Sequence, residues 1–321
     1  MRPQKLHAHS VPPGLGTAFW RVWLLPLAGG VGRRSQAGAG GCRNLLPALA
    51  VALAACLLGA TGARAEVAPL EGKGAEVGLR LGALGLSVSQ RPAFAGAASL
   101  EASATPNFVL HHGRLTLSNG GPLASRVGEP AEAGLAAEVL AQDRLSLRVS
   151  LNLEAGRQSS RIPHLRGLHD IPPHVRGRLQ LAWRLAPRWE LMGVWRGDLT
   201  DRGTGSSAEV VVLHEWRPAV QEAHPWRVSA GWAAQWRDTR QANLVHGVSL
   251  QDASRSAFAA YQLDAGWTDA RLFAHARREL GGQWVAYASA AHETLLQEAA
   301  RSPITQRVRS FSLSLGLGRR F

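Results

Sequence analysis

The chain ends in residues 310–321, S-F-S-L-S-L-G-L-G-R-R-F, and this stretch decides the fold class. The large apolar residues Phe311, Leu313, Leu315 and Leu317 alternate with serine and glycine, so a β-strand would place them on one face. A strand of a soluble antiparallel sheet buries its apolar face and carries charged residues on the other. Here the other face carries only small residues, which indicates lipid on one side and a crowded polar lumen on the other.

The same alternation recurs upstream, at residues 145–153, 175–185 and 226–236. Segments of about ten residues with this pattern, separated by turn residues, are typical of a transmembrane β-barrel. A soluble β-sandwich or lipocalin-like barrel would share the alternation but would expose charged residues on its outer face. Tryptophans close to the expected strand ends instead suggest the aromatic girdles of a membrane barrel: Trp183, Trp189, Trp195, Trp226, Trp232 and Trp236.

The expected fold class is all-β, an antiparallel transmembrane barrel of about 12 strands (10–12), because an even number returns both chain ends to the periplasmic side. A change of parity between Ala83 and Leu84 predicts a β-bulge in the first strand. Short connections alternate with long ones near 119–131, 156–173, 237–263 and 296–306, and the short ones should face the periplasm. The strands are expected near 77–89, 98–110, 113–118, 132–140, 144–155, 174–186, 188–199, 206–216, 226–236, 264–278, 283–295 and 307–321.

Residues 1–65 have the character of an N-terminal extension with a signal peptide, which leaves residues 66–321 for the barrel. Arg43 precedes the apolar stretch 45–58, and a small-x-small site predicts cleavage after Ala65. That stretch is shorter than the roughly 20 apolar residues of a membrane-spanning helix. Residues 53–56 resemble a lipobox, so lipidation at Cys56 stays open, as does the true translation start.

Composition narrows the possible partners and cofactors. The net charge is +13, but no run of five or more Lys and Arg residues occurs, so nucleic acid is not an expected partner. Cys42 and Cys56 are the two cysteines, and both precede the expected cleavage site, which suits an oxidising compartment. No cofactor motif is present. His164, His169, Asp170 and His174 share one long connection, but their spacing matches no common metal motif and we expect no metal site.

No catalytic site is expected either. The sequence has no G-x-S-x-G and no H-E-x-x-H motif. His275, Ser289 and His292 fall on neighbouring expected strands, but the alternation does not fix their faces, and activation would need a histidine within hydrogen-bond reach of the serine. The sequence therefore predicts a protein that is not an enzyme.

Four segments resemble the MltA-interacting protein (MipA)/OmpV family of outer-membrane proteins. Residues 243–261, with Gly247, Val248, Ser256 and Tyr261, resemble the family's "YFGV…A..SGL..Y" segment, and Ser302-Pro303-Ile304 resembles its "SP(I/V)" loop. Residues 91–96 and 165–171 resemble "PRYPGS" and "LRGLGDI". The aromatic pair usual before Gly247 is here Val245-His246, and the "PRYPGS" tyrosine is absent.

The resemblance implies an outer-membrane barrel that acts as a structural scaffold, linking a lytic transglycosylase that degrades murein to a murein synthase. It leaves the partner-binding residues and the oligomeric state unknown. It also implies that Leu313, Leu315, Leu317 and the terminal Phe321 form the signal read by the barrel-assembly machinery before the barrel enters outer-membrane lipid.

A small-solute channel is the alternative function. Seven arginines fall on the expected lumen parity, and basic lumens favour anions. A barrel of about twelve strands is narrow, however, and the arginines could pair with Glu154, Glu190 or Asp198 and close it. The arginines are Arg80, Arg148, Arg176, Arg178, Arg184, Arg196 and Arg227.

Overall fold

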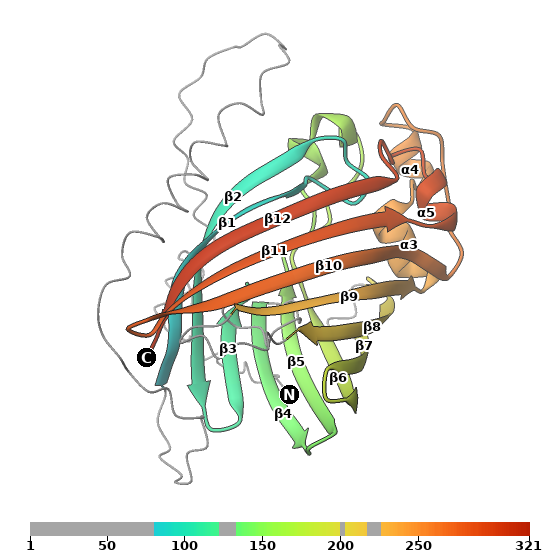
Figure 1. The fold of residues 1–321 in the computed structure, drawn as a ribbon. Coiled ribbons are helices and arrows are strands. Elements are labelled where there is room, and N and C mark those ends of the chain that lie inside the picture. Colours follow the sequence, from blue (N-terminus) through green and yellow to red (C-terminus); the bar gives the residue numbers. More distant parts are fainter. Residues whose placement is uncertain (1–79, 122–132, 200–202, 217–225) are drawn as a thin grey trace, which may run out of the picture. The chain divides into compact units, whose positions relative to one another are not determined.

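The computed structural model describes residues 80–121, 133–199, 203–216 and 226–321. The expected signal segment, with the cleavage site at Ala65 and both cysteines, lies outside the described residues. Within them the chain forms twelve strands (Figure 1): β1 Arg80–Pro92, β2 Leu100–His112, β3 Leu115–Asn119, β4 Ala133–Ala141, β5 Leu145–Glu154, β6 His174–Ala186, β7 Trp189–Asp198, β8 Ser206–Trp216, β9 Trp226–Arg237, β10 Gly266–Gly281, β11 Trp284–Leu295 and β12 Arg309–Arg320.

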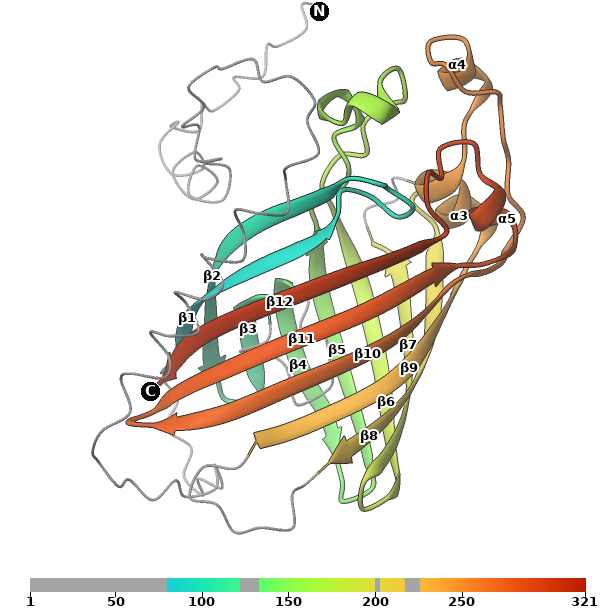
Figure 2. The ribbon, with the colours of Figure 1, turned by 45° about the horizontal axis from the view of Figure 1, so that its top comes forward.

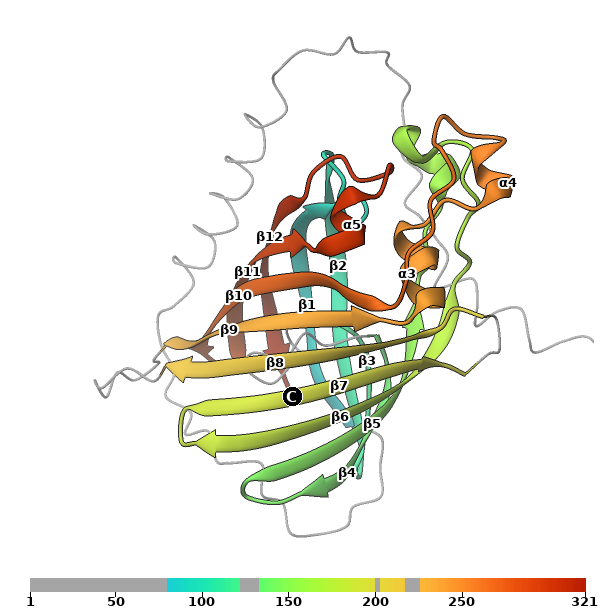
Figure 3. The same ribbon diagram turned by 90° about the vertical axis from the view of Figure 1, so that its right-hand side faces the viewer.

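The strands form one closed barrel in which every strand is antiparallel to both neighbours. The first and last strands close the barrel. β12 pairs with β1, with Leu317 opposite Leu86 and Ser314 opposite Ser89. Figure 3 shows the two sides of the wall, with β6 to β9 in front and β1, β2 and β12 behind. The all-β antiparallel barrel of about 12 strands expected from the alternation is confirmed.

The large apolar residues of the strands lie on the outer face of the barrel. Leu84 and Leu86 on β1 are 50% and 54% exposed, whereas the alternating Ser87 is buried. On β6, Leu179 and Leu181 face outward and Arg178 and Gln180 are buried inside. A surface of this kind is stable only against lipid, because in water it would expose a continuous apolar belt.

The tryptophans follow the expected girdles except at one position. Trp183, Trp189 and Trp226 lie at strand ends near the short turns, and Trp195 and Trp236 lie near the opposite ends of β7 and β9. Trp232 is instead in the middle of β9, opposite Val212 and Leu272, so its assignment to a girdle was wrong. Its outward parity follows from the alternation, but it was already in the middle of the expected strand 226–236, so parity alone did not place it in a girdle.

The bulge in β1 lies earlier than the parity change suggested. The register with β2 shifts between Leu81 and Ala83, so the extra residue is Gly82 rather than a site between Ala83 and Leu84. The His111 ring of β2 lies where a side chain at residue 82 would project, and a glycine there accommodates it. His111 and His112 are themselves the last residues of β2, not part of the following turn.

The connections differ at the two ends of the barrel. Tight turns at 113–114, 142–144, 187–188 and 282–283 lie at the end that holds the C-terminus (Figure 2). The opposite end carries the long connections with their short helices: η1 Ser159–Arg161, η2 Pro163–Leu165, α3 Thr239–His246, α4 Leu250–Ala253 and α5 Gln297–Arg301. Bacterial barrels keep short turns and both chain ends in the periplasm, which makes the long-loop end extracellular. No helix among the described residues is long and apolar enough to cross a membrane.

Candidate functional site

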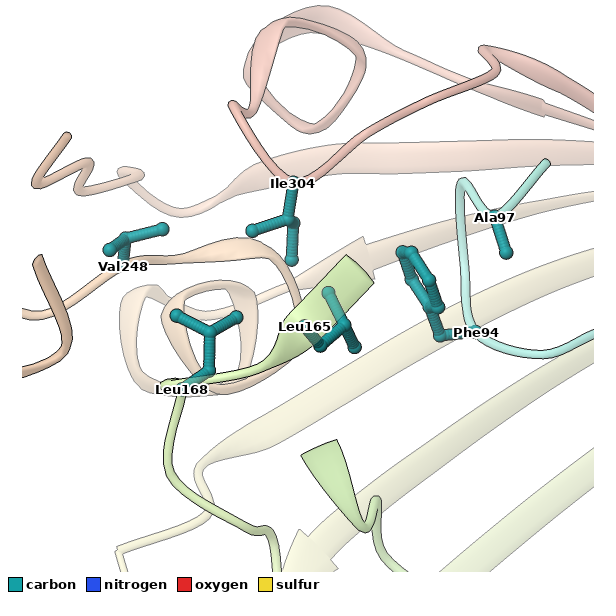
Figure 4. Close-up of a cluster of buried hydrophobic side chains, with 6 residues drawn as sticks. All are labelled: Phe94, Ala97, Leu165, Leu168, Val248 and Ile304. Carbon is teal, nitrogen blue, oxygen red and sulfur yellow. The ribbon is translucent and has the colours of Figure 1, made fainter. Parts of the chain in front are cut away.

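Four connections far apart in the sequence pack together at the extracellular end, and we call them the loop cap: residues 93–99, 155–173, 238–265 and 296–308. Figure 4 shows the apolar side chains at their centre. Leu165 and Ile304 have no exposed surface, and Val248 is 1% exposed. The complete cluster is Phe94, Ala97, Leu165, Leu168, Val248 and Ile304.

The four segments that carry the family resemblance are the segments that form this cap. Phe94, Leu165, Val248 and Ile304 each come from a different one of them. The sequence placed these segments in loops, and the structure agrees, but no pattern in the sequence indicated that they would share one apolar core. Burial of the cluster removes apolar surface from water at an end of the barrel that lipid does not cover.

Backbone hydrogen bonds join the first and last connections of the cap. The Gly96 carbonyl accepts hydrogen bonds from the amides of Gln306 and Arg307, at 2.8 and 3.0 Å. The side-chain oxygen of Gln306 in turn accepts a hydrogen bond from the Ala98 amide at 2.9 Å. The β1–β2 connection is therefore held against the β11–β12 connection by both backbone and side chain.

His164 links the β5–β6 connection to the other three parts of the loop cap. Its Nε2 lies 3.0 Å from the Ile304 carbonyl, and its ring lies between Phe94 and Phe258, with centroid distances of 6.0 and 5.1 Å. Arg157 makes a similar link, because its Nη1 donates to the Val245 carbonyl at 2.9 Å. Both side chains connect the β5–β6 loop to other parts of the cap.

A second polar link joins His169 to Asp252. His169 Nδ1 lies 2.6 Å from the Asp252 carboxylate, whose side chain is 1% exposed, and the His169 amide donates to the same carboxylate at 3.0 Å. Arg255 Nη2 adds a further bond at 2.9 Å. Burial alone would raise the pKa of Asp252, but hydrogen bonds from His169, Ser249 and Arg255 lower that pKa to about 2.

The histidines of the β5–β6 connection do not converge on a metal site. His164 and His169 have the cap partners just described, and His174 lies 3.3 Å from Glu154 in the lumen wall. Asp170 accepts hydrogen bonds from the amide and hydroxyl of Ser160. In the described ranges, no group of three or more His, Cys, Asp or Glu residues is placed to hold a metal ion.

The remaining family-motif residues also support the cap. Gly247 ends α3, with its amide bonded to the Asn243 carbonyl at 2.9 Å. Tyr261 donates its hydroxyl to the Glu298 carbonyl at 3.0 Å, and Ser256 Oγ accepts from the Phe258 amide at 3.3 Å. Ser302, followed by Pro303, donates its hydroxyl to the His246 carbonyl at 2.5 Å.

His246, the second residue of the Val245-His246 pair that precedes Gly247, is fully buried. Neither ring nitrogen has a hydrogen-bond partner among the described residues. Burial, with a smaller effect in the same direction from the positive charges of Arg237 and Arg157, lowers the pKa of His246 to about 3. The imidazole is therefore neutral, and its ring fills space inside the loop cap.

Below the cap, charged side chains of nearby strands pair along the inner face of the barrel wall. Arg176 is 2% exposed and bonds to Glu154 at 3.2 Å and to the Arg196 carbonyl at 3.0 Å. Glu209 bridges two arginines, Arg196 at 3.0 Å and Arg271 at 2.7 Å. These pairs neutralise the guanidinium groups within the barrel wall.

The sequence named Glu154, Glu190 and Asp198 as carboxylates with which the lumen arginines could pair. Arg176 does pair with Glu154, and Arg196 pairs with Glu209, a residue that the sequence analysis did not name because β8 alternates poorly. Asp198 also accepts a hydrogen bond from the Thr204 amide in the β7–β8 loop. Of the seven arginines, Arg176, Arg178 and Arg196 are buried in the lumen wall, and Arg80, Arg184 and Arg227 lie near the short-turn ends of their strands.

An apolar cluster occupies the lumen wall closer to the periplasm, where the sequence predicted a crowded polar lumen. Met192 is 2% exposed, and Phe273 projects from β10 toward the same region. It was hidden from the sequence because in-facing and out-facing residues of β8 are both apolar. The cluster comprises Ala182, Met192, Val211, Leu213, Ala233 and Phe273.

On the opposite wall, Asn107 joins three strands. It is 1% exposed, and its amide group donates to Ser87 Oγ at 2.9 Å and to the Tyr287 hydroxyl at 3.0 Å. His275 and Ser289 face each other in the β10–β11 register, and His292 has the opposite parity to Ser289. That parity separates His292 from the other two residues of the trio considered above.

Comparison with solved structures finds other outer-membrane barrels at low similarity. The NanC porin is 7% identical, with 74% of this chain and 100% of that chain covered and a TM-score of 0.38. An outer-membrane channel from Pseudomonas putida F1 is 15% identical, with 80% and 100% covered and a TM-score of 0.40. The outer-membrane channel DcaP of Acinetobacter baumannii is 8% identical, with 76% and 97% covered and a TM-score of 0.34. At these values the likenesses say nothing about the substrates or partners of this chain.

No curated protein matches the sequence. A family model described as MltA-interacting protein MipA matches residues 84–321, which is the barrel from β1 to the last residue. The apolar outer belt and the closed antiparallel wall agree with a place in the bacterial outer membrane. The chain belongs to the MipA family and is a bacterial outer-membrane β-barrel.

Proposed function

We propose that the protein is a non-catalytic scaffold of the cell envelope, which holds a lytic transglycosylase and a murein synthase at the periplasmic end of the barrel. The family description names an interaction with MltA, and this property is what we transfer to the chain. The partners would contact the periplasmic turns, because that end faces the murein layer.

The observation that carries the proposal is that paired charges and an apolar cluster line the inner face of the barrel wall. Arg176, Arg196 and Arg271 are paired with carboxylates in the upper lumen. Met192 and Phe273 belong to the apolar cluster below them, and the loop cap packs around its own apolar core at the extracellular end. A wall built in this way favours a rigid support over a path for solutes.

The test is direct binding between the purified barrel and a purified lytic transglycosylase. The barrel is immobilised in detergent or in a lipid disc, and a soluble form of the enzyme is passed over it. We expect saturable binding that survives washing, with a micromolar or tighter dissociation constant. An unrelated twelve-stranded barrel serves as control, and equal binding to both barrels, or to neither, would refute the scaffold.

A small-solute, anion-preferring channel is the second candidate, favoured by the buried arginines of the lumen wall. Arg178 and Arg196 are each 8% exposed, and Arg176 is 2% exposed. Rings of basic side chains favour anions in pores. Planar-bilayer recordings separate the candidates: steady open-channel currents with anion selectivity would support the channel, and their absence at high protein load would support the scaffold.

A further inference from the structure

A cavity with a volume of about 590 Å³ opens at the periplasmic end of the barrel. It is lined by the β4–β5 turn, the β6–β7 turn and the end of β8, which lie together in Figures 2 and 3. Six charged side chains line it: Asp143, Arg144, Arg184, Arg188, Glu190 and Glu215.

The cavity is a recess in the mouth of the lumen. Arg184 and Glu190 are direct partners in the β6–β7 register and share the lumen parity of their strands. Leu213 also lines the cavity, and it is a buried member of the apolar cluster in the lumen wall. A ligand would therefore enter from the periplasm and meet apolar side chains at the inner end.

Three of the four exposed charges in the cavity lining are positive. Arg144, Arg184 and Arg188 are exposed, as is Asp143, whereas Glu190 and Glu215 are half-buried. The Arg184 guanidinium is oriented by a bond from Nη1 to the Asp143 carbonyl at 3.0 Å. Guanidinium groups bind carboxylates through paired, charge-assisted hydrogen bonds, and the two deeper glutamates provide a place for an ammonium group.

The volume of the cavity limits the kind of molecule that it can bind. Ligand pockets typically span about 300 to 1,000 Å³, so this cavity suits a molecule of a few residues. A folded protein partner buries on the order of 800 Å² per side on a broad surface, which a recess between two turns does not provide. The occupant is therefore a short chain with free carboxylates, an ammonium group and small apolar parts.

We propose that this cavity binds short peptides that carry several free carboxylates and one ammonium group, the chemistry of murein stem peptides. The inference rests on the proposed function, because it would let the scaffold bind the murein that its partner enzymes act on. Arg144, Arg184 and Arg188 bind the carboxylates, Glu190 and Glu215 receive the ammonium group, and Leu213 contacts the apolar parts.

The test is calorimetric titration of the full mature barrel, in detergent, with a murein tetrapeptide containing diaminopimelate. We expect binding to the free acid and a loss of at least about tenfold when the peptide carboxylates are amidated, the effect of losing one charge-assisted pair. Equal binding of the amidated peptide would overturn the proposal. Tighter binding of an all-L peptide of matched charge would also overturn it, since it would identify the end of a protein chain as the ligand.

Matched variants locate the site. Arg188→Gln lies in an exposed turn and should weaken binding about tenfold, and Arg144→Gln with Arg188→Gln should weaken it further. Arg114→Gln removes an exposed arginine from the β2–β3 turn at the same end but outside the cavity, and it should leave the affinity unchanged. Equal losses in all three variants would overturn the proposal, with heat-modifiable migration on gels as the check that each barrel is folded.

The peptide titration contains no enzyme, so the two proposals fail separately. If the barrel captures the transglycosylase but does not bind the peptide, the scaffold stands and the peptide site is refuted. If the barrel binds the peptide but not the transglycosylase, the peptide site stands and the scaffold is refuted.

Discussion

The ring of Tyr287 on β11 lies across Gly316, its direct register partner on β12. A side chain at residue 316 would collide with the ring, whose hydroxyl accepts a hydrogen bond from Asn107 at 3.0 Å and lies 3.4 Å from the Leu86 carbonyl. The small residue on the inner face of the last strand is thus required by an aromatic ring that reaches across it. Serine and glycine are on that face because the lumen is crowded as well as polar.

Gly316→Ala should therefore destabilise the barrel by about 1–3 kcal/mol, the usual cost of overpacking a filled interior. The free energy of unfolding is measured from urea transitions of the barrel in detergent. Gly193→Ala is the matched control, because a Cβ at this residue of β7 meets nothing within 4 Å. Adding Tyr287→Ala should relieve the clash, so the double variant should lose less than the sum of the single losses; simple additivity would contradict the contact.

The sequence was sufficient for the barrel wall and insufficient for the cap. Alternation with a period of two is a local property of the chain, so the strands around Leu179 and Leu313 could be read directly. The contact between Leu165 and Ile304 joins residues far apart in sequence, and no local pattern specifies it. Glu209 was missed for a different reason: β8 alternates poorly, so the pattern did not show which of its residues face the lumen.

Removing a buried side chain from the cap should open the cap without unfolding the barrel. Ile304→Ala deletes part of a fully buried side chain, which typically costs about 2–5 kcal/mol. Because the cap is separate from the strand ladder, we expect faster protease cleavage within residues 238–265 and unchanged heat-modifiable migration. Leu250→Ala on α4 is the control, since Leu250 is 77% exposed. If Ile304→Ala is cleaved no faster than Leu250→Ala, the cap is not held by this cluster.

The cap should also weaken as the pH falls below about 6.5, the usual pKa of histidine. The folded cap keeps His246 neutral, with a pKa of about 3, while an opened cap would let it take up a proton. Proton uptake by the open form alone reduces the free energy of opening between about pH 6.5 and pH 3. Amide hydrogen exchange within residues 239–247, measured from pH 7 to pH 4 and corrected for intrinsic rates, reports this directly.

His246→Leu removes the titrating group and should flatten that pH dependence. His112→Gln, an exposed histidine at the other end of the barrel, should keep the wild-type slope. An unchanged slope in His246→Leu would assign the pH dependence to another group in the cap. Asp252, with a pKa of about 2, loses its contribution only between about pH 4 and pH 2, which lies below the measured range.

Glu209 should be the most sensitive carboxylate of the lumen wall. It is 6% exposed and bridges Arg196 and Arg271, so Glu209→Gln leaves two guanidinium groups without their shared counter-charge. Breaking a buried pair from one side typically costs about 3–5 kcal/mol, because the remaining charge stays desolvated.

Urea unfolding of Glu209→Gln should show a loss of this order, against little change for Glu101→Gln, an exposed carboxylate on β2. Replacing Glu209 and Arg196 together by Gln and Met should recover part of the loss, since it removes one of the stranded charges. A single variant as stable as the control would mean that water already screens this part of the lumen, and the filled wall on which the scaffold proposal depends would then be in error.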